Sequence, residues 1–423
     1  MSRADLVLAG CRQALTCRGP VPKRKEALSD IGLLENAWIA SLAGALVFVG
    51  SEADFKREVR LADKAEVIDC RDLVVLPGLV DSHTHLPFAG TREEEFSLRL
   101  KGWSYQQLAA GGLGILTTVK ATRAAGQEEI LGLCLERLDR MLLNGATTVE
   151  AKSGYGLNLK DELKQLEVLK RAAASHPVDI VPTFMGAHEV PPEFKERRQE
   201  YITLLLEEVL PAVQKKRLAE FFDVFCERGV FSPAETQRLA EAAKAAGLGI
   251  KVHADEFTDL GGAGLAVDLG ARSAEHLIAV SEEGIGRLAS SATAAVLLPG
   301  VSFFLRLERR APARSLIERG AAVALASDFN PGSSHVSSML FVLRLGVFTL
   351  RLGLEEALNA CTANAAYAVG REKRVGRIEP GLQADLLLCD IPNYVFLAYE
   401  PDRNPIRHVV KNGRIVVRDG RRV

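Results

Sequence analysis

Residues 77–85 read Pro-Gly-Leu-Val-Asp-Ser-His-Thr-His, and the interpretation of the whole chain starts from them. The apolar run that begins at Leu79 is short and follows Pro-Gly, which is typical of a buried strand. His83 and His85 end this run two residues apart, so both side chains lean to the same face of an extended chain. Two imidazoles in this arrangement can share one metal ion.

A short apolar strand followed by an amphipathic segment recurs along the middle of the chain. The strand candidates are residues 79–83, 147–151, 179–184, 222–225, 249–253, 273–276, 293–298 and 322–326. Helix candidates between them include residues 128–143, 160–175, 193–214, 233–246 and 313–319. Ser232, Pro233 and Glu235 have the spacing of an N-cap, a first helical position and a capping box. About eight strand–helix units predict an α/β fold, a (β/α)8 TIM-type barrel.

The two ends of the chain follow a different pattern. Short β-like runs without a helical period fill residues 5–76, and strand-like runs recur at residues 384–390 and 406–417. Asn412-Gly413 lies between apolar runs, which predicts a hairpin turn. We therefore expect an antiparallel unit at residues 5–76, and residues 1–76 and 370–423 together as one small β domain beside a barrel that spans residues 77–369.

The composition limits the classes of partner. The chain has 423 residues, of which 48% are hydrophobic and 25% charged, with a formal net charge of -1. This balance provides no overall positive charge to bind nucleic acid or an anionic membrane. No apolar run approaches the ~20 residues that a membrane-spanning helix needs. The seven cysteines are scattered and include no Cys-x-x-Cys pair, so we expect no disulfide framework and a cytoplasmic location.

The other histidines reinforce the metal hypothesis, because most of them follow predicted strands. His188 follows the third strand, while His253 and His276 end the fifth and sixth. Asp328 follows the eighth strand. Residues at the carboxyl ends of barrel strands gather at one mouth. A third imidazole and a carboxylate would complete a site with three nitrogens and one oxygen, suited to Zn²⁺ or Fe²⁺.

The run at residues 77–85 resembles the first-strand motif of the amidohydrolase superfamily, whose fold is a (β/α)8 barrel beside a small β domain built from both termini. Three further runs resemble the imidazolonepropionase family within it. They are Thr-Thr-Val-Glu-Ala-Lys-Ser-Gly-Tyr-Gly at 147–156, Met-Gly-Ala-His-Glu-Val-Pro-Pro at 185–192 and Asp-Phe-Asn-Pro-Gly-Ser at 328–333. The similarity extends from about Gly78 to the C-terminal strands.

This resemblance implies hydrolysis of the cyclic amide of 4-imidazolone-5-propanoate, a step of histidine degradation, with the help of one divalent metal ion. The implied metal ligands are His83, His85, His253 and Asp328. The implied catalytic residues are His276, Glu256 and Asp328. The implied substrate contacts are Arg92, Tyr155, His188, Glu256, Asn330, Gly332 and Ser333. Binuclear members of the superfamily carry a modified lysine on the fourth strand, and residues 223–227 contain none, so one ion is expected.

Several alternatives remain open from the sequence. A related deaminase, acting on formimidoylglutamate or cytosine, would use similar ligands, and a non-catalytic scaffold could be built on the same barrel. Dimers are common among the proteins that the chain resembles, which allows a homodimer here. Many family members carry Gln where this chain has Glu256, so its acid–base role is less secure than that of His276. The glycines at 111, 112 and 114 predict a loop over the barrel mouth.

Overall fold

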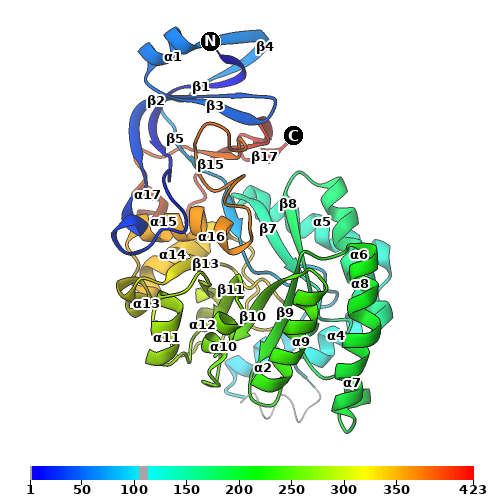
Figure 1. Cartoon of the computed structure of the whole chain (residues 1–423). Coiled ribbons are helices and arrows are strands. Elements are labelled where there is room, and N and C mark those ends of the chain that lie inside the picture. Colours follow the sequence, from blue (N-terminus) through cyan, green and yellow to red (C-terminus); the bar gives the residue numbers. More distant parts are fainter. Residues whose placement is uncertain (1, 104–112) are drawn as a thin grey trace.

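The computed structural model describes residues 2–103 and 113–423, and these residues form two separate sheets (Figure 1). One sheet is a parallel barrel, and the other is made from the two terminal segments. This arrangement confirms the predicted fold class. The division at residues 76/77 and 369/370 stays a prediction. Gly111 and Gly112 of the predicted loop lie outside the described residues.

The barrel sheet has eight strands, and each neighbouring pair along it is parallel. Its strands are β6 (Leu79–Asp81), β7 (Ala146–Lys152), β8 (Asp179–Ala187), β9 (Phe221–Cys226), β10 (Gly249–Ala254), β11 (Ser273–His276), β12 (Ala294–Leu297) and β13 (Ala322–Leu325). Strands that are buried on both faces appear in a sequence as short apolar runs, which is why all eight could be located beforehand.

Helices surround the barrel and supply its outer layer (Figure 1). In chain order they include α2 (Glu93–Leu100), α4 (Ile115–Ala124), α5 (Gln127–Leu143), α6 (Leu159–Ser175), α7 (Arg198–Leu204), α8 (Leu210–Lys216), α9 (Pro233–Ala245), α10 (Gly262–Asp268), α11 (Glu282–Ala289), α12 (Pro299–Phe304), α13 (Ala313–Arg319), α14 (Met339–Leu350), α15 (Leu354–Cys361) and α16 (Ala363–Ala368). Among the described residues, no helix combines the length and apolar character needed to cross a bilayer.

The first and last barrel strands meet just beyond their carboxyl ends. The Asp328 amide donates to the His83 carbonyl at 3.0 Å, and the His85 amide donates to the Phe329 carbonyl at 3.0 Å. Just before these residues in the chain, the Asp81 carboxylate accepts hydrogen bonds from the Ser327 amide at 3.0 Å and from the Ser327 hydroxyl at 2.5 Å. These contacts join the first and last strands of the barrel and bring His83 and His85 beside Asp328.

The second sheet joins the two termini of the chain. Its strands are β1 (Ser2–Leu15), β2 (Leu33–Leu42), β3 (Ala45–Gly50), β4 (Val59–Asp69), β5 (Val74–Pro77), β14 (Leu386–Cys389), β15 (Ile406–Lys411), β16 (Arg414–Arg418) and β17 (Arg421–Arg422). The N- and C-terminal halves meet where β5 pairs antiparallel with β14. The predicted hairpin at Asn412-Gly413 is confirmed, with positive φ at both residues between β15 and β16.

The antiparallel pairing predicted for the N-terminal segment is present between β1 and β2 and between β2 and β3, but β1 pairs in parallel with both β4 and β5. Parallel pairs need long connections that a local pattern does not reveal. The sheet lies at the end of the barrel where the strands begin (Figure 1). There Lys411 contacts Asp179 at 2.8 Å, and Gly78 donates to the Asp385 carbonyl at 2.9 Å.

Local helix signals were reliable where they rested on a cap. Ser232 accepts from the Glu235 amide, and the Glu235 carboxylate accepts from the Ser232 amide, so the capping box of α9 is present. The helix predicted over residues 193–214 begins instead at Arg198 and contains one π turn, Leu205–Val209, between α7 and α8. Pro211 lies in the first turn of α8 and has no amide hydrogen to donate to a preceding carbonyl, so the regular hydrogen-bond ladder is interrupted at the π turn before it.

Replacing Ser232 by Ala should lower the free energy of unfolding by about 0.5–2 kcal/mol, because the N-terminal amides of α9 lose their acceptor. A urea titration followed by circular dichroism measures this loss. Ser232→Thr keeps the hydroxyl and should change stability much less. Equal losses in the two variants would mean that the cap does not stabilise α9.

Candidate active site

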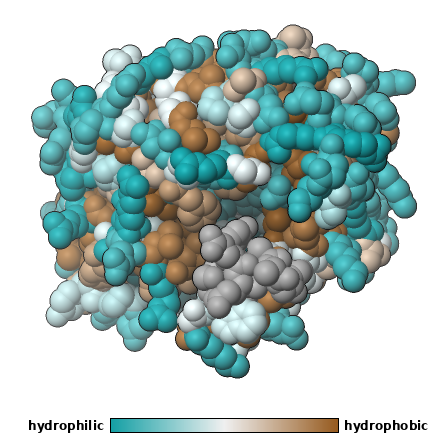
Figure 2. Space-filling view, turned by 90° about the horizontal axis from the view of Figure 1, so that it is seen from below, coloured by the Kyte–Doolittle hydropathy of each residue, from teal (hydrophilic) through white to brown (hydrophobic). Residues whose placement is uncertain are grey.

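The candidate residues gather at the end of the barrel where the parallel strands finish. His83 and His85 follow β6, His253 lies in β10, His276 ends β11 and Asp328 follows β13. Figure 2 looks onto this face of the molecule, where apolar side chains border a hollow. The five side chains are buried, with at most 2% of any of these residues exposed. Residues that lie up to 245 positions apart therefore lie together in one buried region.

The four predicted metal ligands converge through specific atoms. The Nε2 atom of His85 lies 3.3 Å from that of His83 and 3.4 Å from that of His253. The Oδ1 atom of Asp328 lies 3.2 Å from His83 Nε2 and 3.3 Å from His85 Nε2. The ligand atoms of His83, His85 and His253 thus lie within 4.8 Å of one another, and those of His83, His276 and Asp328 form a second such group.

The outer nitrogens of two of these rings lie beside carboxylates. His83 Nδ1 pairs with the Glu275 carboxylate, and His253 Nδ1 lies 3.1 Å from Asp223 Oδ2. An imidazole that donates through Nδ1 presents the lone pair of Nε2 on its inner side. Lone pairs and a carboxylate oxygen repel one another when they face the same point, and a divalent cation removes that repulsion. The donor set fits a borderline ion such as Zn²⁺ or Fe²⁺.

The loop after β13 holds Asp328 in position. Its Oδ2 atom accepts from Asn330 Nδ2 at 2.9 Å and from Ser333 Oγ at 3.1 Å. Asn330 Oδ1 in turn accepts from the amides of Gly332 and Ser333, both at 2.8 Å. Asn330 and Ser333, predicted as substrate contacts, therefore already have a structural task, which is to turn Asp328 Oδ1 towards the histidines.

Two residues of the site have an unusual backbone. His276 has φ of 74° and Asp328 has φ of 52°, in the left-handed region that residues other than glycine rarely adopt. Such conformations persist where the surrounding structure imposes them, and they cluster at functional sites. Here these conformations turn the backbone away from β11 and β13, while the side chains of His276 and Asp328 stay at the barrel mouth.

His276 and Glu256 form a second pair beside the proposed ligands. His276 Nδ1 lies 3.5 Å from Glu256 Oε1, and the His276 ring centroid lies 5.0 Å from that of His253. Burial lowers the pKa of His276 to about 3 and raises the pKa of Glu256 well above its usual value. The loop that begins at Glu256 is held by Glu227 Oε2, which accepts from the amides of Phe257 and Thr258 at 2.9 and 3.1 Å.

Tyr155 and His188 lie against the ring of His85. The His188 ring stacks on it with centroids 4.8 Å apart, and the Tyr155 ring centroid lies 5.9 Å away. His188 Nδ1 donates to the Gly154 carbonyl at 3.0 Å, which leaves its Nε2 atom as an acceptor. Burial lowers the pKa of His188 to about 3 and raises the pKa of the Tyr155 hydroxyl. Both residues are thus neutral walls of the site.

Arg92 lies at the start of α2 and is held by an acidic neighbour. Glu95 accepts from Arg92 Nη2 at 2.5 Å and from Nε at 2.9 Å. The guanidinium group also packs on Gly332, where an added Cβ atom would lie 1.9 Å from Nη1. A larger residue at position 332 would require the end of the Arg92 side chain to move. The Glu95 carboxylate binds the Nε and Nη2 atoms of Arg92 and makes no hydrogen bond to Nη1.

The largest omission of the sequence analysis is a buried set of charges beneath the site. Lys152 and Glu150 on β7, Asp223 on β9 and Glu275 on β11 are all fully buried. The sequence does contain a signal for them, because each is a charged residue inside an otherwise apolar strand. Charged residues are rarely buried without a partner. Glu95, which orients Arg92, had no comparable signal in its run of three glutamates.

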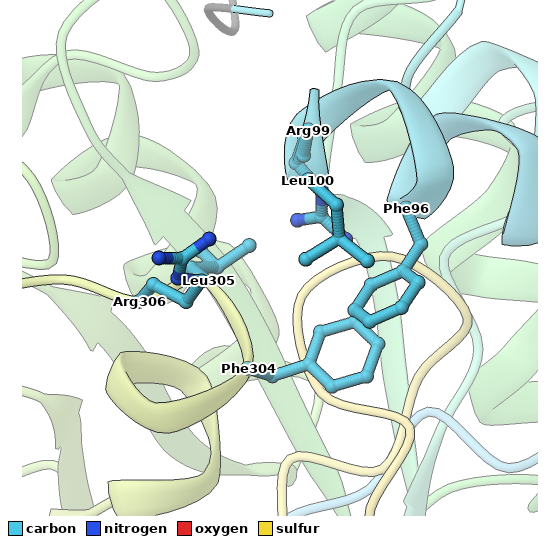
Figure 3. Close-up of a pocket in the computed structure, with 6 residues that line it drawn as sticks. All are labelled: Phe96, Arg99, Leu100, Phe304, Leu305 and Arg306. Carbon is cyan, nitrogen blue, oxygen red and sulfur yellow. The ribbon is translucent and has the colours of Figure 1, made fainter. Parts of the chain in front are cut away.

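A separate pocket of about 210 Å³ opens between α2 and α12 (Figure 3). Phe96 and Phe304 pack there with ring centroids 4.9 Å apart, and the Arg99 guanidinium lies 5.4 Å from the Phe304 ring. None of its six lining residues is a predicted site residue. Arg99 nevertheless donates to the Gly332 carbonyl at 2.9 Å, so this pocket borders the loop that packs on Arg92.

The known proteins with similar sequences belong to the family that the sequence motifs resemble. The model of the amidohydrolase family matches residues 74–416. An imidazolonepropionase of Symbiobacterium thermophilum is 50% identical over 422 residues, covering 100% of this chain and 99% of the relative. An imidazolonepropionase of Geobacillus kaustophilus is 48% identical over 421 residues, covering 98% and 99% of the two chains.

Two solved structures share the fold at low sequence identity. An adenosine deaminase of Xanthomonas campestris with bound zinc superposes with a TM-score of 0.74 at 19% identity, covering 100% of this chain and 95% of that one. The N-isopropylammelide isopropylaminohydrolase of Burkholderia multivorans gives a TM-score of 0.71 at 19% identity, covering 99% of each chain. At this identity the likeness shows the fold alone.

Replacing His253 by Ala should remove the bound metal, because one of the four converging ligand atoms is lost. Metal analysis of the purified variant by atomic emission measures this directly. His276→Ala is the matched control: His276 lies close to His83 and Asp328 but is not one of the four proposed ligands, and the variant should retain the metal. Loss of metal in the control would make His276 a ligand.

Proposed function

This chain belongs to the amidohydrolase family, and on that basis we propose that it is a cytoplasmic imidazolonepropionase of histidine degradation. It hydrolyses the cyclic amide of 4-imidazolone-5-propanoate to N-formimidoyl-L-glutamate. Full-length identity of 48–50% to imidazolonepropionases of two organisms supports this specificity. The structural observation that supports the chemistry is the short distance from His85 Nε2 to the other proposed ligand atoms, 3.3 Å to His83, 3.4 Å to His253 and 3.3 Å to Asp328 Oδ1.

We assign His83, His85, His253 and Asp328 as the ligands of one divalent ion, Zn²⁺ or Fe²⁺. When bound, such an ion lowers the pKa of water and polarises a carbonyl oxygen. Carboxylates beside the ligands orient two of the histidine rings for metal binding. Glu275 and Asp223 lie on the Nδ1 sides of two rings, and a carboxylate in this place favours the tautomer that presents the Nε2 lone pair to a metal ion.

His276 and Glu256 are the proposed proton carriers of the reaction. The oxygen of water adds to the ring carbonyl carbon, the carbon–nitrogen bond breaks, and the ring nitrogen takes the proton that water gives up. His276, a buried neutral imidazole, is placed to receive that proton, with Asp328 Oδ1 as a second acceptor at the mouth. Glu256, 3.5 Å from His276 Nδ1, is placed to return a proton to the ring nitrogen.

The remaining proposed contacts bind and orient the substrate. The substrate has a propionate group, and the site already contains Asp328 and Glu256, so a cation is needed to receive that carboxylate. Arg92 supplies it, since Glu95 fixes Nη2 and Nε and leaves Nη1 for another acceptor. Tyr155 and His188 line the space on the other side of His85, where the imidazolone ring can lie against them. The Asn330–Ser333 loop borders the carboxylate side through Gly332.

The activity is tested by following the loss of imidazolone propionate spectroscopically with the purified protein. We expect turnover that ends when the metal is removed by a chelator and returns with Zn²⁺ or Fe²⁺. Ring opening releases no ammonia, whereas a deaminase of this family would release one molecule per turnover. Ammonia release from formimidoylglutamate or cytosine, without loss of the imidazolone, would favour the deaminase alternative. No turnover of either kind would favour a non-catalytic scaffold.

Arg92→Ala should raise KM about 10- to 150-fold with kcat little changed. The propionate is remote from the ring carbonyl, so its contact has similar strength in the ground and transition states, and a charge-assisted hydrogen bond contributes about 1.5–3 kcal/mol. Steady-state kinetics with imidazolone propionate provide both constants. Arg92→Lys should recover part of the loss, because an ammonium group keeps the charge without the planar fork. An unchanged KM in Arg92→Ala would place the carboxylate elsewhere.

A further inference from the structure

The Lys152 side chain ends among three carboxylates in the barrel interior. Its Nζ atom lies 2.7 Å from Glu150 Oε1, 2.7 Å from Asp223 Oδ2 and 3.1 Å from Glu275 Oε2. All four side chains are completely buried. The contact with Glu150 Oε1 is a hydrogen bond, and the contacts with Asp223 and Glu275 are ion pairs at short distance.

Two of these oxygens are the same atoms that contact proposed metal ligands. Glu275 Oε2 pairs with Nδ1 of His83, and Asp223 Oδ2 lies 3.1 Å from Nδ1 of His253. The ammonium group and the two imidazoles therefore share acceptors. A carboxylate that turned away from Lys152 would also change its contact with the ring that it orients.

The same strand also fixes the backbone between the two histidines of the first motif. The Lys152 amide donates to the Thr84 carbonyl at 2.9 Å, and Glu150 Oε2 accepts from the Thr84 amide at 3.2 Å. Thr84 Oγ1 donates to the Glu150 carbonyl at 2.8 Å. Glu150 thus contacts both Lys152 and the peptide that separates His83 from His85.

We propose that Lys152 is a positioning residue for the metal site: its ammonium group holds Asp223 and Glu275 in the orientation that aims His253 and His83 at the ion. This inference rests on the metal site of the proposed function and adds a residue to it. It assigns the lysine of the Lys-Ser-Gly-Tyr-Gly run a task beneath the site, away from substrate. Partners that orient histidine ligands typically change metal affinity 10- to 100-fold when they are removed.

A second buried lysine separates positioning from simple charge balance. Lys251 Nζ lies 2.6 Å from Glu275 Oε1 and 3.0 Å from Ser273 Oγ. It is as fully buried as Lys152 and belongs to the same set of charges. Its ammonium group also lies 3.3 Å from the Ser82 carbonyl oxygen, and its contact with Glu275 is through Oε1, not through the Oε2 atom that pairs with His83. Removal of either lysine changes the total charge by the same amount, but only Lys152 contacts both orienting oxygen atoms.

The test measures Zn²⁺ affinity by chelator competition on the metal-depleted full-length protein. Lys152→Met should weaken Zn²⁺ binding about 10- to 100-fold. Lys251→Met, the matched control, should weaken it clearly less. The Co²⁺-substituted proteins provide a readout besides activity, because the visible absorption of bound Co²⁺ changes when its ligands are displaced. We expect a changed spectrum for Lys152→Met and a spectrum close to the original for Lys251→Met.

A double variant, Glu150→Gln with Lys152→Met, keeps the net charge of the buried set and an acceptor for the Thr84 amide. It decides the matter if the single variant does not fold, and it should bind Zn²⁺ as weakly as Lys152→Met. Wild-type affinity in the double variant would overturn the proposal, since Lys152 would then only neutralise Glu150. Equal weakening by Lys251→Met would also overturn it, in favour of charge balance.

The two proposals fail in different ways. A wild-type protein that holds no divalent ion would refute the metal site of the proposed function. A wild-type protein that binds one ion, together with Lys152 variants that bind it equally well, would refute only the role of Lys152.

Discussion

The closure of the barrel between β6 and β13 is the constraint on which the site depends. The strands are short at this seam, and the contact is made just beyond them, by Asp328 with the His83 carbonyl and by His85 with the Phe329 carbonyl. Asp81 and Ser327 add a buried side-chain link below it. The same hydrogen bonds that complete the fold therefore set the spacing between the first and last proposed ligands.

The barrel interior under the site contains ionic groups instead of the branched apolar residues that fill many such barrels. Burying charges costs several kcal/mol for each ion, and the cost is offset only by close and complete pairing. Each described lysine there is within 3.1 Å of carboxylate oxygens. These charges sit where ligand histidines need acceptors on their outer nitrogens, so the polar core and the site form one network.

The two ends of the barrel have separate tasks. Where the strands begin, the sheet of the terminal segments packs through Asp179, Asp385 and Lys411, and these contacts join distant parts of the chain. Where the strands end, the loops hold the proposed ligands and substrate contacts. Loops carry chemistry at the mouth because their backbone is free to adopt conformations such as those of His276 and Asp328.

Local patterns in the sequence by themselves determined the eight strands, the capping box at Ser232 and the hairpin at Asn412-Gly413, since each depends on neighbours a few residues apart. The motif resemblance also pointed to the proposed ligands. Only the tertiary structure decided the parallel pairing of β1, the π turn before Pro211 and the partners of Lys152. These depend on contacts between strands far apart in the chain, and a charged residue in an apolar run does not reveal which carboxylates will surround it.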